Sequence, residues 1–298
     1  WTRSRRLGRQ LNRHELHEIL RSQIYGMDID RDAVYVAAFS LYLALLEMDP
    51  DPQPPDALRL PQLLGRGGGL EPNLYVQDFL NTNHEFNRTH PFSNGGFDLI
   101  VSNPPWTALK RSSAPYDPDA PNSGVQWGIT YTEQHGIPDA KPDQAFMWRS
   151  RDFTGPDARI ALVVGSRLLH QVSPSGQRWR DMFLETNVVH SVVDLSDLVG
   201  ESLLFWWKSS TRLPASVIVF SPRKPSPNAA LQYIAPKWYP GIRNRDEILL
   251  SSSDIQTLPQ QLLRENPFIL KTAFRGSPRD SRLLGRLHDL RTLDTLLS

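Results

Sequence analysis

Phe97-Asp98-Leu99-Ile100-Val101-Ser102-Asn103-Pro104-Pro105-Trp106 is the most informative stretch of this 298-residue chain. Its apolar residues predict a short buried strand that ends at Ser102. The two consecutive prolines cannot continue a helix or donate to a sheet ladder, so they hold the chain in a rigid turn just past the strand. We expect this turn to direct the Asn103 side chain and the Pro104 carbonyl outward as fixed hydrogen-bond acceptors, with the aromatic face of Trp106 beside them.

This arrangement fits one chemical group, an exocyclic amine on a flat ring. The amine has two N–H donors for the two acceptors, and the ring stacks on the aromatic side chain. Because accepting both hydrogen bonds turns the nitrogen lone pair toward an electrophile, the motif predicts a reaction at the amine. The alternative is an ordinary strand-ending proline turn with a packed tryptophan. The buried strand before Asn103 favours the amine site.

Short apolar strands alternate with helices on both sides of this stretch. The expected strands are 24–29, 74–76, 97–102, 159–165, 188–195 and 215–221, and the expected helices are 14–23, 32–47, 143–153 and 175–186. This alternation predicts an α/β fold with a mainly parallel sheet that helices cover on both faces. Ligands of such sheets bind at the carboxyl ends of the strands, so the polar residues that end strands are the candidates for a site.

Two acidic residues end the strands that precede residue 97. Asp28 is placed to accept the ribose hydroxyls of a nucleoside-containing cofactor, with Ile29 against the adenine face; the alternative is that it caps the following helix. For Asp30 we favour the cap. Asp78 is placed to accept from the adenine amine of the same cofactor, with Phe79 as an apolar wall; the alternative is a turn residue.

The composition excludes several classes of protein. With 39% hydrophobic and 22% charged residues the chain is typical of a globular protein. It has no cysteine, which excludes disulfides, zinc–thiolate sites and cysteine nucleophiles and suits a reducing compartment. No apolar run approaches the ~18 residues of a membrane-spanning helix. The arginine-rich start has no apolar core after it, so it is not a secretory signal.

The net charge of +1 conceals an uneven distribution. From Arg223 onward there are twelve lysines and arginines against seven acids, whereas the rest of the chain has 21 against 25. A basic tail fits a phosphate-contacting surface, although scattered basic residues also arise by chance. We therefore expect a catalytic core over residues 1–222, followed over residues 223–298 by a linker and the start of a basic recognition region.

Three motifs in order resemble one known family. Residues 24–34 (Ile-Tyr-Gly-Met-Asp-Ile-Asp-Arg-Asp-Ala-Val), 77–80 (Gln-Asp-Phe-Leu) and 97–106 look like the AdoMet-dependent adenine-N6 DNA methyltransferases of the Asn-Pro-Pro-aromatic type. The nearest subtype is the large enzymes of restriction-modification and phage-exclusion systems. Residues 142–146, 159–164, 179–183, 192–195 and 274–280 support that subtype.

The resemblance implies a Rossmann-like class I methyltransferase core with S-adenosyl-L-methionine (AdoMet) as cofactor. It also implies double-stranded DNA as substrate, other subunits of a defence system as partners, no membrane partner, and a prokaryotic cytoplasm as location. The target adenine is flipped out of the duplex and stacks on Trp106, and its N6 is held by Asn103 and the Pro104 carbonyl. The amine attacks the methyl group directly, so no metal is expected. A second stacking face comes from Phe205, Trp206 or Trp207, unless these are core or interface residues.

The chain departs from the family in one respect. A glycine-rich turn should precede Asp28, but residues 1–27 contain only Gly8 and Gly26, and the glycines within 65–69 have no leading strand and fit a flexible loop. We therefore expect the first strand and its glycine turn upstream of Trp1. Two other interpretations stay open: an RNA or protein amine methyltransferase, and a non-catalytic nucleic-acid-binding subunit with a degraded methyltransferase fold.

Overall fold

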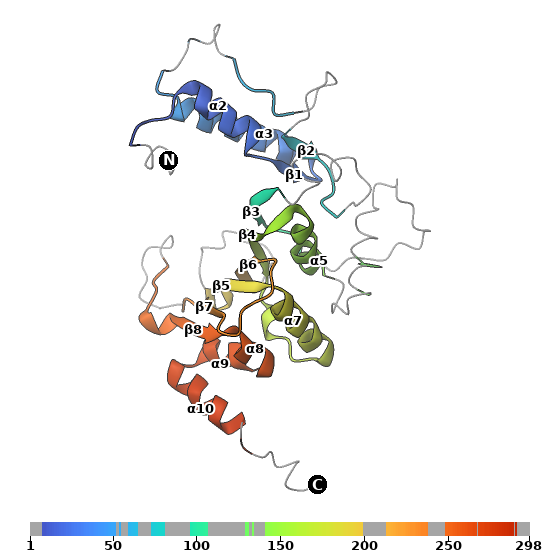
Figure 1. Cartoon of the computed structure of the whole chain (residues 1–298), viewed down its shortest axis with the longest axis vertical. Helices are drawn as coiled ribbons and strands as arrows, with labels where there is room; N and C mark the ends of the chain where they lie inside the picture. Colours follow the sequence, from blue (N-terminus) through green and yellow to red (C-terminus); the bar gives the residue numbers. More distant parts are fainter. Residues whose placement is uncertain are drawn as a thin grey trace. The chain divides into compact units, whose positions relative to one another are not determined.

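The computed structural model forms two compact units, Trp1–Asn81 and Thr82–Ser298 (Figure 1). The structure describes residues 8–51, 54, 59–64, 73–80, 96–106, 129–130, 133, 141–198, 213–237, 248–266, 268–288 and 290. In this described part of the chain, no helix combines the length and apolarity needed to cross a membrane.

The described part of the first unit contains two helices and two short parallel strands. They are α2 (Arg13–Ser22), β1 (Gly26–Asp28), α3 (Arg31–Met48) and β2 (Leu74–Val76). β1 and β2 pair in parallel, with Gly26 opposite Leu74 and Asp28 opposite Val76. The side chain of Asp30 accepts from the backbone N–H of Asp32, which confirms the predicted cap of α3.

The second unit is built on one six-stranded sheet. Its strands are β3 (Phe97–Ser102), β4 (Thr154–Gly165), β5 (Val188–Asp194), β6 (Ala215–Ser221), β7 (Ala230–Ile234) and β8 (Ile255–Pro259), in the spatial order β3-β4-β6-β5-β7-β8. The strands β3, β4, β5 and β7 run in one direction, while β6 and β8 run against them. The α/β fold with a mainly parallel sheet is therefore confirmed. The predicted burial of the strand 97–102 was wrong, because β3 is the first strand in the order of the sheet and its Leu99 and Val101 are 59% and 69% exposed.

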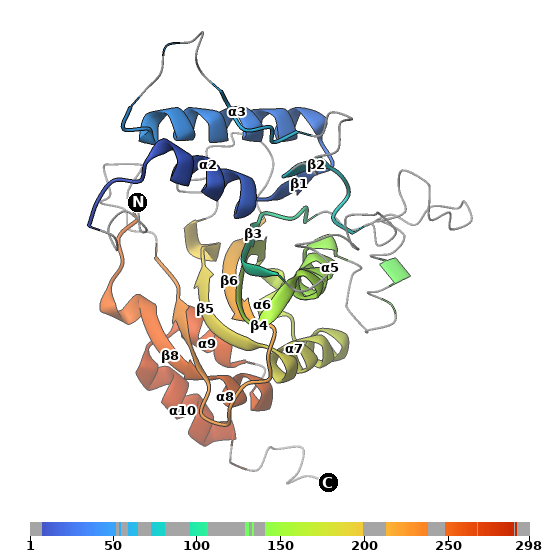
Figure 2. The ribbon, with the colours of Figure 1, turned by 45° about the horizontal axis from the view of Figure 1, so that its top comes forward.

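Helices flank this sheet, and Figure 2 shows α5 and α7 near β4 and α8 and α9 near β8. The helices are α5 (Pro142–Arg149), α6 (Arg167–His170), α7 (Pro174–Thr186), α8 (Gln260–Glu265), α9 (Ile269–Arg275) and α10 (Pro278–His288), with short 3-10 turns η4 (Ser150–Phe153), η5 (Ser196–Leu198) and η6 (Ser252–Asp254). Trp179 and Phe183 of α7 stack with ring centroids 5.3 Å apart. Phe183 meets the fully buried Phe220 of β6 edge to face at 5.0 Å. This aromatic contact anchors α7 to the middle of the sheet.

The sheet continues beyond residue 222, where we expected the core to end. β7 pairs with β5, and β8 pairs with β7, so residues 230–234 and 255–259 belong to the same sheet as β3. The prolines at 222, 225 and 227 lie in the connection between β6 and β7, so they do not stop the sheet from growing. Two smaller differences concern β4, which begins at Thr154 instead of 159, and the helix expected over 143–153, which becomes α5 followed by η4.

Candidate functional site

The Asn-Pro-Pro-Trp turn leaves the sheet at the carboxyl end of β3. The last pair of the ladder joins Ser102 to Leu162 of β4. Pro104 is buried, whereas Asn103 is exposed. Within the described part of the chain, the Asn103 amide has no hydrogen-bond partner. Its oxygen and its N–H groups are therefore available to a ligand.

Trp106, at the other end of the turn, is fixed by two hydrogen bonds. Its indole Nε1–H donates to the carbonyl of Val163 in β4 at 3.1 Å. Its own carbonyl accepts from the Lys141 ammonium, also at 3.1 Å. Because proline has no N–H, neither Pro104 nor Pro105 can donate a hydrogen bond to β4, and the Trp106 indole supplies a donor to that strand instead. The ring is half-buried and its plane is held by the indole bond.

Asp143 joins the start of α5 to the end of β4. Its Oδ2 accepts from the backbone N–H of Gly165 at 3.0 Å, and its Oδ1 accepts from the N–H of Gln144 at 3.0 Å. The residue is only 3% exposed, and this burial raises the pKa of its carboxyl although both hydrogen bonds oppose the rise. The carboxyl ends of β3 and β4 are thus held together by contacts from Lys141 and Asp143.

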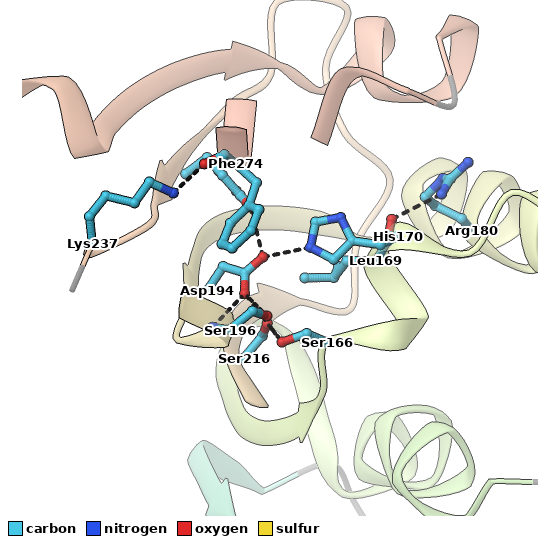
Figure 3. A network of polar contacts seen from close by, with 10 residues as sticks. Ser166, Leu169, His170, Arg180, Asp194, Ser196, Ser216, Lys237 and Phe274 are labelled. Atoms are coloured by element: carbon cyan, nitrogen blue, oxygen red, sulfur yellow. Dashed lines mark hydrogen bonds and ion pairs between the residues drawn. The ribbon is translucent and has the colours of Figure 1, made fainter. Parts of the chain in front are cut away.

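A buried polar network lies further along the same edge of the sheet (Figure 3). Its centre is Asp194, the fully buried last residue of β5. One carboxylate oxygen accepts from the Ser166 hydroxyl at 3.2 Å and from the N–H and hydroxyl of Ser196. The other oxygen bonds to His170 Nε2 at 2.6 Å and accepts from the Tyr233 hydroxyl at 2.7 Å.

These contacts set the charge of the network. Burial opposes ionisation of Asp194, but the hydrogen bonds from His170 and Ser196 outweigh it and lower its pKa to about 2. Burial and the negative charge of Asp194 raise the pKa of Tyr233, so the phenol stays a donor. A buried carboxylate with this many donors is stabilised in its charged form.

Phe274 of α9 connects this network to the helices that follow the sheet. Its ring lies 5.7 Å from the His170 ring and 3.9 Å from the Lys237 ammonium, which also donates to the Phe274 carbonyl (Figure 3). Burial lowers the pKa of Lys237. On the other side of His170, Arg180 Nη1 donates to the Leu169 carbonyl at 3.0 Å. The segment around α6 is thereby held between α7 and α9.

In the first unit, the structure brings Asp28 and Asp78 to the ends of neighbouring parallel strands. The N–H of Gln77 donates to the Asp28 carbonyl at 2.8 Å. Asp28 is exposed and accepts from the Asp30 N–H at 2.8 Å, while Asp78 is half-buried and accepts from the Leu80 N–H at 2.9 Å. Burial raises the pKa of Asp78. Each carboxylate uses one oxygen in its local turn.

The apolar residues expected at the cofactor site directly follow the two acids in the chain. Ile29 is 66% exposed and Phe79 is half-buried, both beside the acids that they follow. Phe205, Trp206, Trp207 and the glycines of 65–69 lie outside the described residues.

The sequence alone did not predict Lys141, Asp143 or His170 as part of the site. Asp143 lies in a stretch that carried the family resemblance, and that stretch was the available signal. The contacts of the three residues join positions 22 to 35 apart in the chain. Patterns of neighbouring residues in the sequence do not predict contacts between residues this far apart in the chain.

Comparison with known proteins identifies the family. The model of the Eco57I restriction-modification methylase family matches residues 22–199, more than half of the chain. The chain belongs to this family, which confirms the resemblance to methyltransferases of restriction-modification systems. No curated protein matches the chain.

Solved structures share the fold at low sequence identity. A modification subunit assigned to a type I restriction enzyme from Vibrio vulnificus YJ016 aligns with TM-score 0.51 and 11% identity over 83% of this chain and 45% of that one. The DNA-bound Type ISP enzyme LlaBIII gives TM-score 0.51 and 10% identity over 78% of this chain and 16% of that one. A nuclease-deletion mutant of the Type ISP enzyme LlaGI aligns with TM-score 0.51 and 13% sequence identity, over 89% of this chain and 21% of that one. The chain thus spans less than half the length of these structures.

The Asp194 network makes a testable prediction about stability. The folded pKa of Asp194, about 2, lies below its ordinary value of 3.8, so the charged carboxylate stabilises the fold above pH 4 and this stabilisation is lost as the pH falls through 2. Asp194→Asn should lower the free energy of unfolding at pH 7 by about 2 kcal/mol, and the difference from wild type should shrink between about pH 4 and pH 2. Urea unfolding of both proteins at several pH values measures this difference in the free energy of unfolding.

The matched control is Asp157→Asn. Asp157 forms a surface ion pair with Arg223 at 3.0 Å, and such pairs contribute little. Equal stability of wild type and Asp194→Asn at pH 7 would contradict the stabilising role of the network.

Proposed function

We propose that this chain is the catalytic part of a DNA methyltransferase that transfers a methyl group from AdoMet to the N6 amine of a flipped-out adenine in double-stranded DNA. The observation that carries the proposal is the exposed Asn103 amide without a partner among the described residues, in a turn whose other end is fixed through Trp106. Membership in a restriction-modification methylase family supports it. We further propose that the whole protein works in the cytoplasm of a prokaryote, with other subunits, in restriction-modification or phage defence.

In this proposal the turn holds the target amine. The Asn103 side-chain oxygen and the Pro104 carbonyl accept the two N–H groups of N6, and the adenine ring stacks on Trp106. AdoMet supplies a methyl group on a positively charged sulfur. The N6 lone pair forms the new N–C bond as the C–S bond breaks, and the extra proton of N6 then leaves to solvent. The protein's own part is to orient the amine and to hold its protons.

The residues of the first unit fit the nucleoside end of AdoMet. Asp28 and Asp78 come from neighbouring strand ends, and in the described part of the chain each keeps one carboxylate oxygen without a partner. We propose that Asp28 accepts from the ribose hydroxyls and Asp78 from the adenine amine. The exposed Ile29 and the half-buried Phe79 would then contact the adenine ring.

The helices α9 and α10 support DNA as the substrate. Their exposed cations are Lys271, Arg275, Arg279, Arg282 and Arg286. Asp280 is the one acid among the described residues of these helices, and its carboxylate accepts from the N–H and hydroxyl of Ser277. A groove of about 780 Å³ is lined by Lys271, Arg275 and Asp280 together with Phe268 and Leu287, so two cations face one acid there. We propose that this surface contacts DNA phosphates.

The first experiment removes the amide of Asn103 from the full-length protein. Asn103→Ala should abolish tritium transfer from AdoMet to duplex DNA, because the amine loses its side-chain acceptor. AdoMet affinity by calorimetry should stay within about twofold, because we place the side chain against the target and not the cofactor. A large loss of AdoMet affinity would show that Asn103 is misplaced. Product analysis should give N6-methyladenine; methylated RNA or protein, or no transfer by wild type, would favour the two other interpretations.

A second experiment tests the stacking role of Trp106. Trp106→Ala should lose about 1–3 kcal/mol of base stacking. Trp106→Phe keeps an aromatic face but lacks the N–H that bonds to Val163, so its transfer rate should lie between those of Trp106→Ala and wild type. Single-turnover rates of methyl transfer, measured for wild type and both variants, show whether the rates fall in this order. Equal rates for wild type and Trp106→Ala would rule out stacking on this ring.

A third experiment tests the cationic surface through the salt dependence of DNA binding. Each neutralised phosphate contributes roughly 0.9 to the slope of log K against log salt. Lys271→Gln combined with Arg275→Gln should therefore lower the slope by about 2. The matched control is Arg223→Gln, because Arg223 is exposed but paired with Asp157. An unchanged slope in the double variant would assign the surface to packing or to a protein partner.

A further inference from the structure

We propose that Lys141 is a positioning residue for this reaction, because its ammonium fixes the backbone of the turn that holds the target amine. This inference rests on the proposed function. Lys141 Nζ donates to the Trp106 carbonyl at 3.1 Å across 35 residues of chain. The contact lies on the motif itself, and it involves neither of the two acceptors that we assign to the amine.

The backbone of Lys141 is held firmly at the start of α5. It has extended backbone angles at the position before the helix, and Pro142 follows it as the first helical residue. Its carbonyl accepts from the N–H of Ala145 at 3.3 Å. Asp143, one residue beyond Pro142, bonds to the Gly165 N–H at the end of β4. The side chain of Lys141 therefore extends from a fixed base.

The turn is held at three points. Its start is fixed by the pairing of Ser102 with Leu162, and its end by the indole bond to Val163 and the carbonyl bond to Lys141. The two prolines restrict the backbone between these points. Removing the Lys141 bond deletes neither of the two acceptors assigned to the amine, nor the indole bond to Val163. It releases only the Trp106 carbonyl, and with it the orientation of the turn.

A charged donor suits this task. Hydrogen bonds in which the donor is ionised are stronger than those between neutral groups. The positive charge of Lys141 also favours the ionised form of Asp143, against the burial that raises its pKa. One side chain therefore acts on both contacts that join α5 to the strand ends. A small displacement of a reacting group can cost about a hundredfold in rate, so the loss of this bond should appear in the chemical step.

The experiment compares Lys141→Met and Lys141→Arg in the full-length protein. Methionine has a similar length but no donor, whereas arginine keeps a charged donor. Single-turnover methyl transfer to DNA should fall about 10- to 100-fold in Lys141→Met. The dissociation constants for DNA and AdoMet should stay within about twofold. Lys141→Arg should recover most of the rate. Lys224→Met, which removes an exposed lysine outside the proposed site, should leave the rate unchanged.

The possible outcomes separate the inference from the function on which it rests. If wild type methylates DNA and Lys141→Met does so at the same rate, the positioning role is overturned while the proposed function stands. A lower unfolding midpoint in Lys141→Met that Lys141→Arg does not restore, together with a proportionate loss of DNA affinity, would make Lys141 a structural residue and also overturn the role. Absence of transfer by wild type would overturn the proposed function and this inference together.

Discussion

The missing N–H groups of Pro104 and Pro105 are the constraint on which the site depends. A strand that meets two prolines cannot extend its ladder, so β3 stops at Ser102 and the chain turns away from β4. The indole of Trp106 then reaches back to the Val163 carbonyl. The β3–β4 ladder ends at Ser102, and the indole bond holds the turn beyond it in one position against β4. Asn103 stands inside the break, where it is exposed and has no partner among the described residues.

The order of the strands spreads the polar groups along one edge of the sheet. Because β3, β4, β5 and β7 run in one direction, their carboxyl ends carry Asn103, Gly165, Asp194 and Ile234 at the same edge. The side chains of Asp194 and Asn103, at two of these strand ends, differ in burial and in hydrogen bonding. Asp194 is fully buried, and donors saturate its carboxylate. The Asn103 amide is exposed and has no hydrogen-bond partner among the described residues. Asp194 therefore stabilises the fold at this edge, whereas Asn103 is available to a ligand.

Local signals in the sequence located β2, β3 and β6 at their observed bounds and placed Asp30 at its cap. The strands β7 and β8 escaped detection because each is a five-residue alternating segment next to proline: β7 follows three prolines and β8 ends at Pro259. Moreover, β7 pairs with β5 and not with β6, the strand before it. Side-chain contacts such as that of Lys141 with Trp106 depend on tertiary structure, which no local pattern encodes. The residues of a motif are therefore readable in a sequence, whereas those that support the motif are not.

The chemistry of the turn also limits which bases it can hold. Adenine carries an exocyclic amine with two N–H donors at C6 and cytosine carries one at C4, whereas guanine and thymine carry a carbonyl oxygen at these positions. In the proposed pose a carbonyl would face the Asn103 oxygen and the Pro104 carbonyl, and both would lose their water without gaining a donor. Sites built to hydrogen-bond a specific group reject an analogue that lacks it far more strongly than apolar pockets do. Under the proposed function, the two acceptors therefore favour an exocyclic amine over a carbonyl oxygen at this position of the base.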